Sequence, residues 1–155
     1  MSGPLGVPSD EVAEITAVGA CVDMHANYRR LSATVSADDF YWPAHRRLFE
    51  ACGQLAHLDG SSLEIRDERM KIAARLAGLS DTALHSIMER RCVRDDVNSV
   101  YARRVHQAAN ARRVMQAAGN VFNRLGAGEC VEDVLGEELK DVLGEVPLLA
   151  GAMRR

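Results

Sequence analysis

The sequence predicts an all-α protein, a compact helical head followed by a two-helix antiparallel hairpin. Two observations favour this fold. Apolar residues recur every three or four positions through several long segments, which is the period of an amphipathic helix. Residues that cap helices, mainly Ser, Asp and Gly, stand between these segments, and no alternating strand pattern of useful length occurs.

The longest helical segment covers residues 97–125, with one interior glycine, Gly119, and no proline. As a helix it would be roughly 43 Å long, with Asp96 as its expected cap and Gly126–Gly128 as its end. Its apolar row is Tyr101, Val105, Ala108, Ala111, Met115, Ala118, Phe122 and Leu125. Two interpretations remain open: the central helix of a bundle, or a helix that also pairs with a second copy of the protein.

Shorter helices are expected before and after this segment. Ser9 is the expected cap of the first, with Val12, Ile15, Gly19 and Val22 facing inward. Ser36 opens a turn like a capping box, and Pro43 suits the first turn of the next helix. The expected ranges are about 10–22, 25–31, 43–58, 63–76, 81–90 and 131–145.

These elements suggest one folded domain with two short tails. Residues 1–9 are rich in Gly and Pro and are expected to be disordered, and 147–155 to be a loose tail. The folded part is expected to be 10–146, with the head at 10–95 and the hairpin at 97–146. A loop of about five residues joins the two hairpin helices, which favours antiparallel neighbours.

The composition gives no sign of a catalytic or metal centre. The two lysines, Lys71 and Lys140, do not follow a glycine, which excludes a phosphate-binding P-loop in these residues. Asp39 and His45 could share a metal, but a cap and a surface imidazole is the more common role of such a pair. We therefore expect no enzyme, no cofactor and no metal. Four isolated cysteines, no signal peptide and no membrane-spanning run favour a cytoplasmic protein.

The arginines leave one alternative open. They recur as pairs at 90–91, 103–104 and 112–113, although the total net charge is −3. The last two pairs point to different sides of the long helix, so they do not form one basic stripe. Local ion pairs are the favoured interpretation, and a nucleic-acid-binding helical regulator is the alternative.

Residues 36–49, SADDFYWPAHRRLF, resemble the N-terminal domain of DnaB-type replicative helicases. The family's D-F-Y-x-x-x-H pattern is matched in register, followed by a phenylalanine. Weaker blocks before and after it, in the expected order, are Ala13–Glu14 with Val18–Gly19, and Tyr101–Ala102 with Val105, Ala109 and Arg112. The matching positions of the main block are Asp39, Phe40, Tyr41, His45 and Phe49. The family's G-G-x-x-Y-L segment is not visible in 78–88.

The resemblance implies a non-enzymatic interaction and oligomerisation domain of the DNA replication machinery. In that family the domain forms a collar that docks primase or a helicase loader, and its hairpins pair between subunits. Expected partners are a second copy in a homodimer or a higher-order assembly, and primase, a loader or a full-length replicative helicase. DNA would be met only indirectly, and no membrane is expected. The chain is expected to be either an excised domain or a free-standing relative without a motor.

The hairpin is the predicted surface of self-association. The long helix has more apolar face than a helix over 131–146 can cover, since the latter is roughly 24 Å long. A soluble monomer seldom exposes a patch of that kind. The predicted interface consists of Met115, Ala118, Phe122, Leu135 and Val142.

Overall fold

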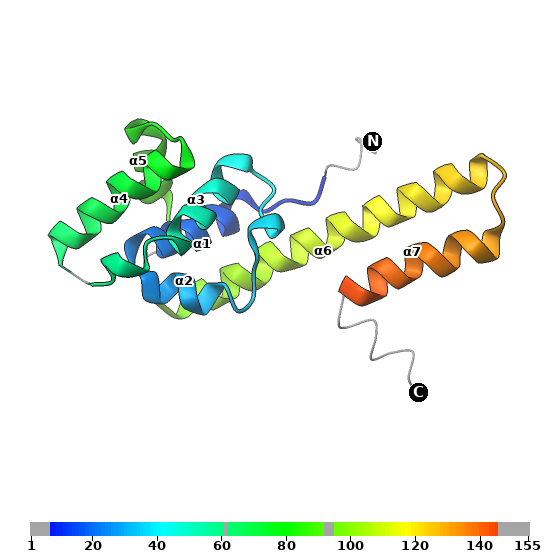
Figure 1. Cartoon of the computed structure of the whole chain (residues 1–155), viewed down its shortest axis with the longest axis horizontal. Helices are drawn as coiled ribbons and strands as arrows, with labels where there is room; N and C mark the ends of the chain where they lie inside the picture. Colours follow the sequence, from blue (N-terminus) through cyan, green and yellow to red (C-terminus); the bar gives the residue numbers. More distant parts are fainter. Residues whose placement is uncertain (1–6, 61, 92–94, 146–155) are drawn as a thin grey trace. The chain divides into compact units, whose positions relative to one another are not determined.

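The computed structural model describes residues 7–60, 62–91 and 95–145, and over these residues the chain is all-α, as predicted. Figure 1 shows the helices in chain order. They are α1 (Glu11–Asp23), α2 (His25–Leu31), α3 (Pro43–Gly53), α4 (Leu63–Ala77), α5 (Asp81–Arg90), α6 (Asp95–Gly126) and α7 (Val131–Glu145), with short 3₁₀ turns η1 (Ala37–Asp39) and η2 (Ala56–Leu58).

The chain forms two compact units. The helical unit comprises Ser9–Ala109, and the hairpin unit comprises Met1–Pro8 with Asn110–Arg155. Helix α6 contributes its first part to the helical unit and its remainder to the hairpin unit. This division falls later in the chain than the predicted border between head and hairpin, and the predicted domain limits stay a prediction. The expected tail 147–155 lies outside the described residues.

The core of the helical unit is built around α1. Every residue from Ala13 to Val22 is buried, so α1 has no solvent face over that stretch. A helix that is buried all round lies inside its domain, and α1 contacts α2, α3, α4 and α5 (Figure 1). Of α6, Ala102 and Val105 join this core. The centre of the bundle is therefore α1 rather than the long helix.

The helix starts follow local capping chemistry. Asp10, not Ser9, caps α1, because its carboxylate accepts a 2.9 Å hydrogen bond from the Ala13 backbone N–H. Ser62 and Ser80 cap α4 and α5 through the N–H groups three residues on. Val12 was expected to face inward but is 54% exposed, because it lies on the outer side of the first turn of α1.

Helix α3 ends at Gly53, five residues before the predicted end at 58. The buried guanidinium of Arg69 holds the chain that follows this end. It donates hydrogen bonds to the carbonyls of Leu55 and Leu58 at 2.8 and 3.2 Å, which gives these buried acceptors partners outside a helix. The same stretch forms η2.

The hairpin unit confirms the two predicted helices in its described part. Helix α6 already includes Asp95, so Asp96 lies inside the helix and is not its cap. Gly128 adopts a left-handed φ of 87°, which a glycine tolerates at a helix end, and closes the turn to α7. Val134 is fully buried, whereas the side chains of Leu139 and 141–145 lie outside the described part.

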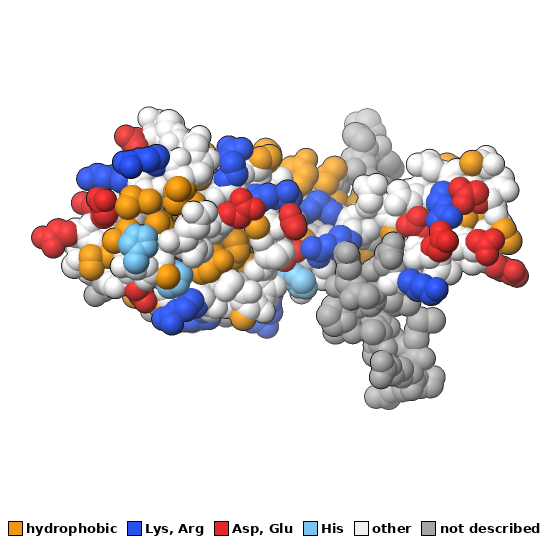
Figure 2. All heavy atoms as spheres, in the orientation of Figure 1, with side chains coloured by type: hydrophobic (Ala, Val, Ile, Leu, Met, Phe, Trp, Pro, Cys, Tyr) orange, Lys and Arg blue, Asp and Glu red, His pale blue; other side chains and the backbone are white. Residues whose placement is uncertain are grey.

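Arg124 holds the turn between α6 and α7. Its guanidinium lies 2.7 Å from a Glu129 carboxylate oxygen, 2.9 Å from Glu137 and 3.4 Å from Glu138. Figure 2 shows acidic side chains gathered over this end of the hairpin unit. Hydrogen bonds to Glu129 and Glu137 raise the pKa of Arg124, which keeps this charge fixed. Over the described helices, none combines the length and the hydropathy that crossing a bilayer requires.

Candidate interaction surfaces

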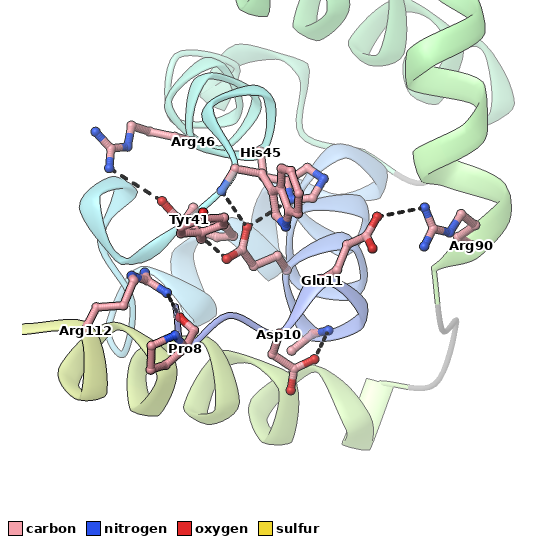
Figure 3. A network of polar contacts seen from close by, with 12 residues as sticks. Pro8, Asp10, Glu11, Tyr41, His45, Arg46, Arg90 and Arg112 are labelled. Carbon is pink, nitrogen blue, oxygen red and sulfur yellow. Dashed lines mark hydrogen bonds and ion pairs between the residues drawn. The ribbon is translucent and has the colours of Figure 1, made fainter. Parts of the chain in front are cut away.

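A buried carboxylate, Glu14, organises the start of α3. It is 1% exposed and accepts hydrogen bonds from the backbone N–H groups of Tyr41 and Trp42 at 2.7 and 3.2 Å. The Nδ1 of His45 lies 2.9 Å from the same carboxylate and donates to it (Figure 3). The backbone N–H groups of Tyr41 and Trp42, just before α3, thus find their acceptor in a carboxylate of α1.

A second carboxylate, Asp39, organises the turn before α3. Its Oδ2 accepts the backbone N–H of Ser36 at 3.0 Å and lies 3.2 Å from Nδ1 of His106 on α6. Phe40 is fully buried and its ring centroid lies 5.0 Å from that of Phe49. The metal considered for Asp39 and His45 has no support here, because each of the two side chains pairs with a different partner.

The D-F-Y-x-x-x-H pattern therefore has a structural explanation. Its Asp closes a turn, its Phe enters the core, and its His meets Glu14 of the upstream block. Tyr101 of the downstream block is half-buried and lies under Arg104, whose guanidinium carbon is 5.3 Å from the ring centroid. Arg112 donates a 2.8 Å hydrogen bond to the carbonyl of Pro8 (Figure 3).

The same network fixes two aromatic rings at the surface. Tyr41 and Trp42 are 40% and 41% exposed, and their rings meet edge to face at 5.3 Å. Of the three consecutive aromatic residues before α3, Phe40 is the one that is fully buried. The pair Tyr41–Trp42 is the first candidate interaction surface, held in place because Glu14 binds both backbone N–H groups.

The hairpin unit carries the second candidate surface. Phe122 is 79% exposed, Met115 42% and Leu135 38%, and Ala118 is also exposed. The side chain of Val142, the fifth residue of the predicted interface, lies outside the described part. These exposures agree with an uncovered apolar surface, and its role as an interface stays a prediction.

Helical geometry turns Phe122 away from α7. Asn120 and Arg124 of α6 meet Glu138 of α7, and each residue turns a helix by about 100°. Phe122 is therefore about 180° around α6 from this contact line, whereas Leu135 is only about 60° around α7 from Glu138.

The arginine pairs are engaged locally. Arg90 pairs with Glu11, Arg91 with Asp23, and Arg104 with Asp10, at 3.1, 2.6 and 2.6 Å. Arg113 donates to the Asn110 side chain at 2.8 Å. These contacts favour structural ion pairs over phosphate binding, as the spacing of the pairs predicted.

No metal-binding cluster emerges from the described residues. No cluster of three or more His, Cys, Asp or Glu side chains able to hold a metal occurs in 7–60, 62–91 and 95–145 with their described side chains. Burial raises the pKa of the Cys52 thiol to about 12, and the pKa of Cys21 rises well above its usual value mainly through burial. Both thiols are therefore core groups and not nucleophiles at neutral pH.

Single-sequence reasoning missed Glu14 and Arg69 as organising residues. Both are charged and fully buried, with relative exposures of 1% and 0%. Their partners lie between 11 and 48 positions away in the chain. Glu14 occurs in the sequence only within a weak family block, and Arg69 lies on a helix most of whose other charged residues face solvent.

Comparisons with known proteins agree on a family. Residues 7–62 match the family model described as DnaB-like helicase N terminal domain. No curated protein sequence matches the chain. Among 17 solved chains that match is the N-terminal domain of DnaB helicase from Mycobacterium tuberculosis, with a TM-score of 0.70, 19% identity, and coverage of 91% of this chain and 100% of that chain. The resemblance predicted from the sequence is thereby confirmed: residues 7–62 match the DnaB-like helicase N-terminal domain model, and the chain has the all-α fold of the N-terminal domain of that DnaB helicase.

Proposed function

We propose that the chain is a non-enzymatic interaction and self-association domain, which pairs through its hairpin and docks a replication protein. The single observation that carries this proposal is the apolar face of the hairpin unit, where Phe122 is 79% exposed. Fully burying one Phe side chain contributes about 1.5–3 kcal/mol. A symmetric pair of hairpins would bury two copies of it.

The docking partner is proposed from the family. Primase, a helicase loader or an intact replicative helicase are the candidates, and the docking surfaces are the Tyr41–Trp42 pair or the hairpin face rather than the tails. Tyr and Trp are enriched at the energetic centres of interfaces. The proposed cytoplasmic location and indirect relation to DNA follow from the same role.

A binding experiment separates these surfaces. The immobilised full chain is tested against purified primase, loader and replicative helicase by surface plasmon resonance. We expect Trp42→Ala or Phe122→Asp to weaken binding of one partner at least about tenfold, as for an interface hot spot. Deletion of 147–155 and of 1–8 serves as the control. Binding lost only on tail deletion would contradict the proposal.

An activity measurement tests the non-enzymatic part. We expect no ATP hydrolysis by the purified chain, because neither Lys71 nor Lys140 stands in a P-loop. A turnover that persists through repeated purification and maps to a site on this chain would contradict this expectation. The double variant Lys71→Met, Lys140→Met provides the matched control.

A further inference from the structure

Gly19 lies inside α1, in the stretch from Ala13 to Val22 that is buried throughout. Glycine inside a helix costs stability relative to alanine, so its presence here needs a reason. A Cβ at this position would lie 2.9 Å from the Cβ of Arg91 and 3.0 Å from its Cδ. Both distances are shorter than the separation of about 3.5–4.0 Å that two carbon atoms prefer. The glycine predicted to face inward thus makes room for the side chain of Arg91.

Arg91 directly follows α5, and its side chain crosses Gly19 to reach a carboxylate at the end of α1. Its Nε and Nη2 donate hydrogen bonds to the two carboxylate oxygens of Asp23 at 2.6 and 3.2 Å. Its Nη1 donates to the carbonyl of Met88 in the last turn of α5, where helix carbonyls lack intrahelical partners. The side chain is 15% exposed, so this arginine connects α1 and α5 from a largely buried position.

Asp23 binds a second guanidinium. Arg66 of α4 donates a 2.7 Å hydrogen bond to its Oδ1. A carboxylate at the C-terminal end of a helix meets the negative end of the helix dipole, which is unfavourable, and α1 has no basic residue in its last turn. The charge of Asp23 is therefore stabilised by arginines from other parts of the chain, and Arg91 is the one that it binds through both oxygens.

We propose that Arg91 is a latch that holds the start of α6 on the helical unit, with Gly19 and Asp23 as the residues that receive it. Helix α6 begins at Asp95, four residues after Arg91. Four residues span at most about 14 Å, so an Arg91 fixed on α1 limits where α6 can begin. Opening of the latch frees the first turns of α6 while the core around α1 stays folded.

The latch lies apart from the α6 residues that enter the core. Among the described side chains of α6, Ala102 and Val105 are buried in the core and Tyr101 packs against it. Val100, one residue earlier, is 45% exposed. The stretch between Arg91 and Tyr101 is therefore bounded by the latch at one end and by the core at the other. Parts of a structure with few buried contacts open at a lower free energy than the core, and the latch opposes such opening here.

Hydrogen exchange in the full chain tests the latch. In Arg91→Met we expect the backbone amides of residues 99–104 to exchange at least about tenfold faster, and those of α1 to change much less, because local opening becomes easier. The matched control is Arg90→Met. Arg90 is the adjacent residue and also pairs with α1, through an exposed 3.1 Å contact with Glu11 (Figure 3). The control should leave the amides of 99–104 unchanged.

Three results of this experiment would overturn the proposal. Unchanged exchange at 99–104 in Arg91→Met would mean that the start of α6 does not depend on Arg91. Equal acceleration throughout α1 and α6 would mean that Arg91 adds only to global stability. The same local acceleration in Arg90→Met would mean that any ion pair at the end of α5 has this effect.

The fit between Gly19 and Arg91 is tested separately by combining Gly19→Ala with Arg91→Gly. In the parent the added methyl group displaces Arg91, and we expect the urea midpoint to fall. In the Arg91→Gly chain the contacting atoms are absent, and the higher helix propensity of alanine should raise the midpoint. A fall in both chains would mean that another neighbour requires glycine at 19. A rise in the parent would mean that Arg91 yields without cost, and either result contradicts the latch.

Discussion

At the residue scale, Glu14 shows how one buried charge connects distant parts of the sequence. Its carboxylate serves two backbone N–H groups and one imidazole from residues 27–31 positions away. A buried charge of this kind is tolerated only when its hydrogen bonds are satisfied. The arrangement therefore explains why the chain needs an acid at 14 and a histidine at 45 together.

Replacing Glu14 tests this explanation. Glu14→Ala leaves three donors without their acceptor, and we expect the free energy of unfolding to fall by roughly 3 kcal/mol. The control is Glu50→Ala on the exposed side of α3. Urea denaturation followed by circular dichroism gives both values. A loss below about 1 kcal/mol for Glu14→Ala would show that water replaces the carboxylate at little cost.

The buried thiols give a pH-dependent prediction. The pKa of Cys52 is raised by burial from 9.0 to about 12, so the native state keeps a proton that the unfolded chain releases above about 9. The stability contribution is thus complete below pH 9 and is lost as pH rises towards 12. We expect urea denaturation to show a steeper fall in stability above pH 9 for the parent than for Cys52→Ala. Parallel alkaline profiles would contradict the raised pKa.

Individual core residues could be predicted from the sequence only where apolar spacing marks them. Ile15 and Val22 stand at helical spacing on the first helix and are buried as expected. Arg69 and Glu14 could not be found this way, because the sequence pattern of a charged residue on a helix is the same whether it faces solvent or a set of distant carbonyls. The prediction for Val12 was wrong for the opposite reason. Its spacing fits a core position, but its place in the first turn of the helix leaves its side chain exposed.

At the element scale, Arg69 ties the end of α1 to the chain that follows α3. It donates to the carbonyls of Cys21 and Val22 at 2.8 and 3.1 Å, and to those of Leu55 and Leu58. Carbonyls at helix ends lack intrahelical partners. One guanidinium, which has five N–H donors, therefore supplies hydrogen bonds to four carbonyls that would otherwise each need a separate donor.

Removal of this guanidinium should loosen both helix ends at once. We expect Arg69→Met to lower the free energy of unfolding by about 3 kcal/mol or more, since buried acceptors lose charged hydrogen bonds. Arg75→Met, on the exposed side of the same helix, is the matched control. Hydrogen exchange should show faster exchange at the ends of α1 and α3 in Arg69→Met. Exchange confined to α4 would contradict the tying role.

The helices themselves were largely predictable because their ends are encoded locally. Ser62, Ser80 and Gly78 mark boundaries by short-range chemistry, and the predicted ranges 25–31, 81–90 and 131–145 agree with the structure. The end of α3 was not predictable from its own segment. The residues after Gly53 are held by Arg69, which lies beyond Gly60 in the chain and reaches them only in the folded state.

At the scale of the whole molecule, the chain combines a unit built around a buried core and a unit with an uncovered face. The helical unit buries a cluster of apolar side chains around α1, while Tyr41 and Trp42 stay exposed. In the described part of the hairpin unit, Val134 is buried while Phe122 and Leu135 are exposed. The fold could be anticipated from the sequence, but the extent of this uncovered face depends on which α6 residues of the hairpin unit α7 leaves to solvent.

The central claim is that this face pairs two copies of the chain, and the most direct test is its mass in solution. Light scattering coupled to size exclusion, at tens of micromolar, should give a dimer for the parent. Phe122→Asp should give a folded monomer, because a carboxylate in the paired face costs several kcal/mol. The control Val12→Asp, on the exposed side of α1, should remain a dimer. A parent that is monomeric under these conditions, or a Phe122→Asp variant that stays dimeric, would contradict the account.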